Sequence, residues 1–204
     1  MTRLIVVRHG ETAWNVSGRL QGVTDEPLNA RGREQAARAA RAIVSHVRPP
    51  ATVVASPLSR ARDTAVPIAA ALGAQPHTDA RLIERTYGVW EGLTWDERVA
   101  LDPVEAQRWR DRKEPRIDGY ENHTTVASRM LAAVDAWLPR AGDGDVVFVT
   151  HGSSGRMLLL ALLGMPLDSV ALGPLGNAAW SVLGRAREGS WTLERHNVDA
   201  ADDA

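Results

Sequence analysis

The chain of 204 residues contains no cysteine, which excludes disulfide bonds, zinc sites built from thiolates and a cysteine nucleophile. Lysine is almost as scarce, since Lys113 is the only one among 24 lysines and arginines. The formal net charge is only -1, so the whole molecule has no bias toward nucleic acid or an anionic membrane, and we expect neither as a partner. Any site for an anion must therefore be local.

Long hydrophobic runs are also missing. The first apolar run covers residues 4–7 and ends at Arg8, unlike a secretory signal, and the longest later run, Met157–Leu163, is far too short to cross a bilayer. We therefore expect a soluble, cytoplasmic protein. The length suits one domain over residues 1–204, and a hydrophobic content of 44% suits a packed core.

Strand patterns alternate with helix patterns along the chain. The apolar runs at residues 4–7, 52–55 and 146–150 are typical of buried parallel strands. Helical spacing of apolar residues follows each run, and Ser56 and Pro57 predict that the second helix starts directly after its strand. The alternation predicts a three-layer α/β/α fold with a mainly parallel central sheet and helices on both faces.

Three further segments complete the expected architecture. A short strand is expected over residues 79–83, and two late strands, 178–183 and 191–195, should add antiparallel strands at one edge. Residues 86–123 are polar and rich in tryptophan, and we interpret them as a small helical insertion over the site. We expect its tryptophans to pack within the insertion rather than to form a ligand platform.

Charged side chains and imidazoles stand where the three main predicted strands end. Arg8 and His9 follow the first strand, Arg60 lies in the first helical turn after the second, and His151 follows the third. The carboxyl ends of parallel strands share one edge, where α/β proteins bind their ligands, so these four side chains should converge. Two guanidinium groups beside two imidazoles suit a tetrahedral anion such as phosphate, and a neutral imidazole can act as a nucleophile.

A proton donor is expected from the segment that leads into the insertion. Glu84 is our candidate, and Glu91, seven residues further on, remains an alternative. We expect no metal or other cofactor. The remaining histidines show no spacing typical of metal ligands, and we assign them to the surface or to loops: His46, His77, His123 and His196.

The order of these motifs resembles the histidine phosphatase superfamily, also called the phosphoglycerate mutase-like family. Arg8-His9-Gly10-Glu11-Thr12 resembles its signature, and Thr150-His151-Gly152 resembles its second histidine motif. The similarity covers nearly the whole chain. One departure is Gly119-Tyr120-Glu121-Asn122-His123, which stands where phosphatases of the family often have Gly-Glu-Ser, so we assign no substrate contact to Glu121. The other matching segments are residues 18–22, 27–32, 56–65 and 84–92.

The resemblance implies a role for each site residue. His9 would attack phosphorus and become a phosphohistidine, while its other ring nitrogen donates to a backbone carbonyl. Arg8, Arg60 and His151 would bind the phosphoryl oxygens and stabilise the charge of the transfer step. Glu84 would protonate the leaving oxygen and then take a proton from water. The implied substrate-binding residues are Thr12, Asn15, Gln21, Gly22 and Gly152.

The implied activity is that of a metal-independent phosphomonoester phosphatase acting on a small phosphorylated metabolite. A phosphoglycerate mutase is an alternative, but the insertion is modest and holds a single lysine, which favours the phosphatase. A binding module without turnover is a third reading, and the full set of catalytic residue types argues against it. The natural substrate and the presence of a homodimer stay open at this point.

Overall fold

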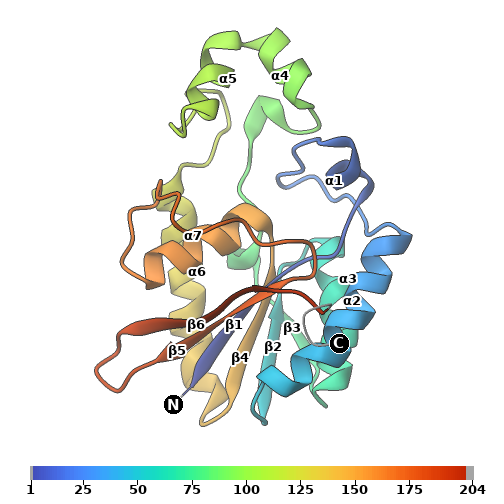
Figure 1. Ribbon diagram of the computed structural model, residues 1–204, viewed down its shortest axis with the longest axis vertical. Coiled ribbons are helices and arrows are strands. Elements are labelled where there is room, and N and C mark those ends of the chain that lie inside the picture. The colour runs from blue at the N-terminus through green and yellow to red at the C-terminus, as the bar shows by residue number, and fades with distance from the viewer. Residues whose placement is uncertain (1, 201–204) are drawn as a thin grey trace.

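The computed structural model describes residues 2–200, which form a six-stranded sheet with helices on both faces (Figure 1). The strand order is β3-β2-β4-β1-β5-β6. Strands β1 to β4 are parallel, while β5 and β6 pair antiparallel with their neighbours. The predicted fold class is thus confirmed, including the late antiparallel edge. The strands are β1 (Arg3–Arg8), β2 (Ala51–Ala55), β3 (Pro76–Thr78), β4 (Asp145–Thr150), β5 (Trp180–Arg185) and β6 (Trp191–Val198).

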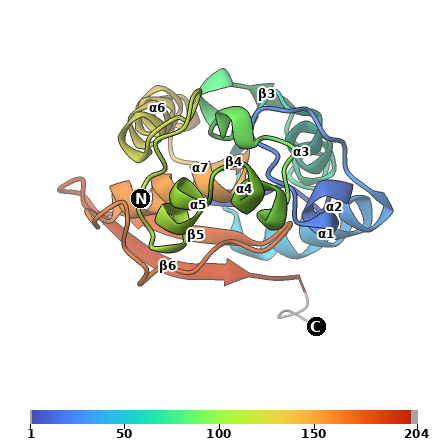
Figure 2. The same ribbon diagram turned by 90° about the horizontal axis from the view of Figure 1, so that it is seen from above.

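Each face of the sheet has its own hydrophobic core. On one face, Ile5 and Val7 contact α2 (Ala30–Ile43) and α3 (Ser59–Ala71). On the other, Leu4 and Val6 contact helices α6 and α7 (Figure 2), which span His123–Trp137 and Gly152–Leu162. The side chains of residues 4–7 in β1 are fully buried, and each contributes about 1.5–3 kcal/mol of transfer free energy. Burial on both faces explains why β1 is a continuous apolar run rather than an alternating one.

The register of the central strands brings the predicted site residues to one edge. Arg8 at the end of β1 pairs with Thr150 at the end of β4, so His9 and His151 both follow immediately beyond the paired ends. Ala55 of β2 pairs with Val149 of β4, which places Ser56 beside the same edge.

The start of α3 differs from the sequence prediction. Ser56 does not cap this helix, which begins at Ser59 after Leu58, a residue without a side-chain cap bond. The Ser56 hydroxyl instead accepts the Leu58 N–H at 3.3 Å and bonds to His151. The prediction was wrong because the local pattern, a serine before a proline, is the same in both cases. It does not show whether the serine hydroxyl caps the helix or bonds to a residue far away in the chain.

The strand predicted over residues 79–83 was also misplaced. The strand that pairs with β2 is β3, and residues Ala80–Leu82 form a short 3-10 helix. The carboxylate of Asp79 accepts the Arg81 N–H at 2.9 Å, which caps this turn and ends the strand before it.

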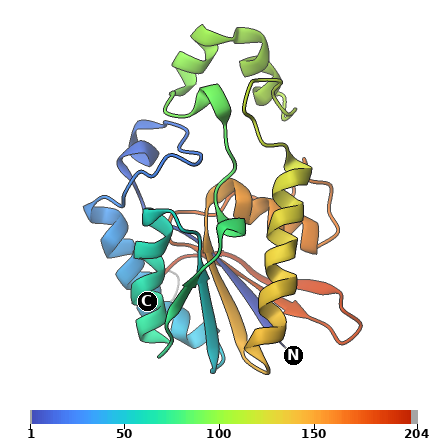
Figure 3. The same cartoon turned by 180° about the vertical axis from the view of Figure 1, so that it is seen from behind.

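The insertion stands above the carboxyl ends of the parallel strands (Figures 1 and 3). It contains α4 (Trp95–Leu101) and α5 (Pro103–Arg110), and extended segments join it to the 3-10 helix Ala80–Leu82 on one side and to α6 on the other. Trp90 is fully buried there and packs edge-on against Trp109, with ring centroids 5.9 Å apart. A further helix, α1 (Ala13–Ser17), lies in the loop after β1. Among residues 2–200, we find no helix with the length and apolarity needed to cross a membrane.

The Asp145 carboxylate links the start of β4 to two other segments. It is fully buried and accepts hydrogen bonds from the side chains of Arg3 (2.7 Å) and Arg48 (3.0 Å) and from both backbone N–H groups. Burial alone would raise the pKa of Asp145, but these hydrogen bonds outweigh it and hold the pKa below its usual value. Because the pKa is lower in the folded state, the stabilisation is present above an unfolded pKa of about 3.9 and is lost as the pH falls through the folded value.

We therefore expect Asp145→Asn to lower the free energy of unfolding at pH 7 by about 1.5–3 kcal/mol, measured by urea titration. The difference from the wild type should shrink as the pH falls below about 4, because the unfolded wild-type chain then binds a proton that the folded carboxylate takes up only at lower pH. Asp143→Asn, an exposed change in the preceding turn, is the matched control and should alter stability at neither pH. An equal loss for Asp145→Asn at both pH values would show that the charge is not responsible.

Candidate active site

His9 lies directly beyond β1 with only 3% of its surface exposed. Its Nδ1 is 2.7 Å from the carbonyl oxygen of Gly10, so Nδ1–H donates there and Nε2 keeps its lone pair. Burial lowers the pKa of His9 well below its usual value, and the nearby Arg8 and Arg60 charges lower it further. The ring is therefore neutral at pH 7, which is the form that can act as a nucleophile.

Arg60 and His151 form one buried hydrogen-bonded unit. Arg60 Nε lies 3.2 Å from His151 Nδ1, and because Nε can only donate, Nδ1 accepts. The proton of His151 is thus on Nε2, which donates to the Ser56 hydroxyl at 2.8 Å. The other Arg60 nitrogens donate to the carbonyls of Gly22 and Thr24, both at 2.7 Å. His151 consequently orients Arg60. Both ring nitrogens of His151 have hydrogen-bond partners within the protein.

The role of Ser56 was not visible in the sequence, where it resembled a helix cap. Removing its hydroxyl would leave the His151 Nε2–H buried without an acceptor. We expect Ser56→Ala to lower the free energy of unfolding by about 1–3 kcal/mol, measured by chemical denaturation. Ser128→Ala, which removes an exposed hydroxyl on α6, should stay within about 0.5 kcal/mol of the wild type. A similar loss in both variants would count against the buried bond.

The loop of residues 21–24 is shaped by Glu91. Gly22 has a φ of +55°, and a Cβ there would lie 2.1 Å from the Glu91 carboxylate, so only glycine fits this close approach. Glu91 accepts the N–H groups of Val23 and Thr24, both at 3.2 Å, and that of Tyr87 at 3.0 Å. These bonds hold in place the Gly22 and Thr24 carbonyls that accept from Arg60, so Glu91 serves to hold this loop.

Glu84, by contrast, reaches the site itself. Its side chain is 7% exposed and lies at the first turn of α7. Oε2 accepts the Ser153 N–H and Oε1 accepts the Ser154 N–H, both at 2.9 Å. Oε1 also accepts the N–H of Arg85 at 2.9 Å. Of the two candidate proton donors, Glu84 and Glu91, contacts between distant segments therefore place Glu84 at the site and Glu91 in the loop.

A cavity of about 160 Å³ lies among these groups. Arg8 lines it, with Nη1 bonded to the Leu175 carbonyl at 2.8 Å and a buried Nε that has no partner within residues 2–200. Thr12 does not reach the cavity, because it is fully buried as the N-cap of α1. His151 is likewise outside the lining. The predicted residues that the structure brings together there are Arg8, His9, Asn15, Gln21, Gly22, Arg60, Glu84 and Gly152.

Four lining residues were missed at the sequence level: Arg19, Leu20, Tyr87 and Ser153. Tyr87 lies within the motif that contains Glu84, so its spacing to that residue was an available signal. Asn177 was also missed, although its side chain donates to the His9 carbonyl and to Asn15 Oδ1, both at 3.1 Å. No sequence signal distinguishes Asn177 from an ordinary loop asparagine.

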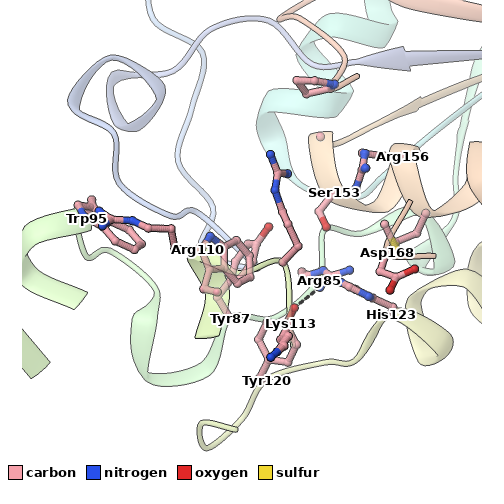
Figure 4. A pocket seen from close by; sticks show the side chains of 15 residues that line it. Arg85, Tyr87, Trp95, Arg110, Lys113, Tyr120, His123, Ser153, Arg156 and Asp168 are labelled. Carbon is pink, nitrogen blue, oxygen red and sulfur yellow. Dashed lines mark hydrogen bonds between the residues drawn. The ribbon is translucent and has the colours of Figure 1, made fainter. Parts of the chain in front are cut away.

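A second, larger cavity of about 670 Å³ adjoins the first and shares Tyr87, Gly152 and Ser153 with it (Figure 4). Trp95 and Trp109 of the insertion line it, so they do more than pack within the insertion as predicted. Its volume is typical of a site for a small organic ligand. Within residues 2–200, no group of three or more histidine, aspartate or glutamate side chains is arranged to hold a metal ion.

A small cavity at the carboxyl ends of parallel strands, lined by a neutral histidine, two arginines and a carboxylate, defines a protein that handles phosphate esters. Comparison with known families agrees with this geometry: residues 4–199 match the model of the histidine phosphatase superfamily (branch 1), and the chain belongs to that family. It is a phosphomonoester phosphatase, a hydrolase of this family.

The relatives include both phosphatases and a mutase. A glucosyl-3-phosphoglycerate phosphatase from Mycolicibacterium vanbaalenii is 39% identical, with 87% of this chain and 82% of that protein aligned. Phosphoserine phosphatase 1 from Hydrogenobacter thermophilus is 32% identical, covering 90% and 86%. A probable phosphoglycerate mutase from Yersinia pestis is 33% identical, covering 100% and 94%. The structure of a mycobacterial glucosyl-3-phosphoglycerate phosphatase with VO3 has a TM-score of 0.88 at 35% identity, covering 98% of this chain and 100% of that one.

Proposed function

We propose that the protein hydrolyses a small phosphomonoester through a phosphohistidine formed at His9. The observation that carries this proposal is the Nδ1–H hydrogen bond to the Gly10 carbonyl, which leaves Nε2 free on a neutral ring. Arg8 and Arg60 flank that ring and can neutralise the charge of the transferred phosphoryl group.

The reaction has two steps. In the first, the His9 Nε2 lone pair attacks phosphorus, the bond from phosphorus to the leaving oxygen breaks, and that oxygen takes a proton from Glu84. In the second, water attacks the phosphohistidine, gives a proton to Glu84, and releases phosphate and the free imidazole. Acid–base help of this kind contributes about 10²–10⁴-fold in rate. Ser56 and His151 support both steps by keeping Arg60 in place.

The leaving group would occupy the larger cavity, which adjoins the phosphate-sized one. Glucosyl-3-phosphoglycerate and phosphoserine, which the phosphatase relatives act on by name, are small enough to belong to this class. We propose a substrate of this kind, without nucleic acid or a membrane as a partner. One domain over residues 1–204 with an insertion at 86–123, and a cytoplasmic location, remain our predictions, and the homodimer stays open.

The proposal is tested by measuring phosphate release from p-nitrophenyl phosphate, phosphoserine and 3-phosphoglycerate in the presence of a chelator. We expect release that the chelator does not reduce. The mutase alternative is checked with 3-phosphoglycerate and a catalytic amount of its bisphosphate. Isomerisation without net phosphate release would overturn the phosphatase, and no turnover of any ester would favour a binding module.

A further inference from the structure

The side-chain amide of Asn15, which lines the smaller cavity, is fixed in one orientation. Its Oδ1 accepts the Thr12 N–H at 3.1 Å and the Thr12 hydroxyl at 3.2 Å. A third donor, Asn177 Nδ2, reaches the same oxygen at 3.1 Å. A backbone N–H can only donate, so the Asn15 atom that faces it is the amide oxygen and not the nitrogen. The amide nitrogen, Nδ2, is therefore left to donate to a ligand in the cavity.

Asn177 is the donor that comes from a distant part of the chain. It lies in the loop between α7 and β5, 162 positions from Asn15. Its Nδ2 donates to Asn15 Oδ1 and to the His9 carbonyl oxygen, each at 3.1 Å. A carbonyl oxygen can only accept, so the orientation of the Asn177 amide is fixed as well. One side chain thus joins the backbone of the proposed nucleophile to the Asn15 amide.

The loop that carries Asn177 is itself bound to the end of β1 and to β6. The Ala178 N–H donates to the His9 carbonyl at 3.1 Å, and Asn197 of β6 accepts the Gly176 N–H at 2.7 Å. Ala178 has a φ of +58°, a left-handed conformation that residues other than glycine adopt where neighbouring contacts hold them in it. The backbone on either side of Asn177 is therefore held in place, which limits the positions open to its side chain.

A donor at Asn15 Nδ2 suits the phosphoryl group rather than the leaving group. Asn15 lines the cavity that contains His9, Arg8 and Arg60, and it is not among the residues that line the larger one. Phosphoryl oxygens are strong hydrogen-bond acceptors. An amide turned the other way would aim the negative end of its dipole at them. The orientation that Asn177 helps to set therefore decides whether Asn15 attracts or repels the transferred group.

We propose that Asn177 is a positioning residue for phosphoryl transfer: it holds the Asn15 amide so that Asn15 Nδ2 donates to the transferred phosphoryl group. This inference rests on the proposed function, because that group is the one His9 would receive. Asn177 acts through Asn15 and has no contact of its own with the substrate. Its effect on the rate should therefore require the Asn15 side chain and should not depend on the leaving group.

The test is a double-mutant cycle on kcat/KM with Asn15→Ala, Asn177→Ala and the double variant. We expect Asn15→Ala to lower kcat/KM by about 10²-fold, as the loss of one donor to a developing charge does. Asn177→Ala should lower it by about 10-fold when Asn15 is present and by less than about 2-fold when residue 15 is already alanine. Each loss should be the same for p-nitrophenyl phosphate and phosphoserine, because both transfer the same group. Arg187→Ala, an exposed change in the turn between β5 and β6, is the control and should alter no rate.

Further measurements keep the test decisive if a variant is less stable. The inhibition constant of inorganic phosphate does not depend on how much enzyme is active, and it should rise by about 3–10-fold in Asn177→Ala but not in Arg187→Ala. Asn177→Leu keeps the size of the side chain without its donors, and it should repeat the cycle if Asn177→Ala does not fold. Asn15→Asp keeps an oxygen for all three donors and replaces only the amide nitrogen, so it should lower kcat/KM more than Asn15→Ala does.

An equal effect of Asn177→Ala with and without the Asn15 side chain would overturn the proposal and place the action of Asn177 at the His9 carbonyl. A wild-type rate in Asn177→Ala, an unchanged inhibition constant of phosphate, or a smaller loss in Asn15→Asp than in Asn15→Ala would overturn it too. Turnover of p-nitrophenyl phosphate by the wild type separates the two proposals. Without that turnover the proposed function fails, and with it but without coupling between Asn15 and Asn177 only this inference fails.

Discussion

His9→Ala is expected to reduce phosphate release by at least about 10⁴-fold, because it removes the atom that forms the covalent intermediate. The variant should still fold, since the site of substitution is a cavity wall at the end of β1 rather than the packed core. The measurement is steady-state hydrolysis of p-nitrophenyl phosphate together with a quench of the enzyme during turnover. The wild type should yield a phosphoenzyme that is stable in alkali and lost in acid, as a phosphoramidate requires.

His77→Ala provides the matched control, because His77 is an exposed imidazole in β3. It should retain both the wild-type rate and the phosphoenzyme. If His9→Ala still formed an alkali-stable phosphoenzyme, another residue would be the nucleophile. If it folded normally and kept the wild-type rate, no covalent step at His9 would be involved.

Glu84→Gln should separate substrates by their leaving groups. An alkoxide must be protonated as it leaves, so hydrolysis of phosphoserine or a phosphorylated sugar should slow by about 10²–10⁴-fold. Nitrophenolate leaves without a proton, so formation of the phosphoenzyme from its ester should be far less affected. The second step also loses its base, and the variant should therefore release a burst of nitrophenolate and accumulate phosphohistidine.

Glu84→Gln is also expected to lose some stability, because both carboxylate oxygens accept backbone N–H groups and an amide can accept at only one of its two ends. The ratio of rates between the two kinds of ester, taken on the same preparation, removes this effect. Glu188→Gln, in an exposed turn, is the control. A uniform loss for alkyl and nitrophenyl esters in the first step would remove Glu84 from the acid role.

The fold was largely predictable because its central strands β1 and β4 are buried on both faces. Residues 4–7 and 146–150 read as continuous apolar runs for that reason, and the helices between them show one apolar side. The failures at Ser56 and at residues 79–83 share one cause. A serine hydroxyl or an aspartate carboxylate can serve either a local cap or another bond, and the local pattern does not decide which one forms.

The sequence predicted which residues form the site better than it predicted what each residue contacts there. Strand ends in one parallel sheet must lie at one edge, so the meeting of Arg8, His9 and Arg60 follows from topology alone. The His151 ring lies near His9, with ring centroids 5.2 Å apart, and bonds to Arg60, but it does not itself line the cavity. No local pattern in the sequence indicates that Arg85 is buried, because its burial depends on contacts with segments far away in the chain.

The motifs and their order by themselves determined the family and the class of reaction. That was possible because a phosphoryl-transfer site needs particular side chains at the ends of particular strands, and those positions are local features of the chain. Only the tertiary structure decided which hydrogen-bond partner each buried polar group has. It paired Ser56 with His151 and Glu91 with the 21–24 loop, and it buried Arg85 with Nε and Nη2 unpaired within residues 2–200. The physical reason is that hydrogen-bond partners and unpaired donors depend on contacts between segments far apart in sequence, which no local pattern encodes.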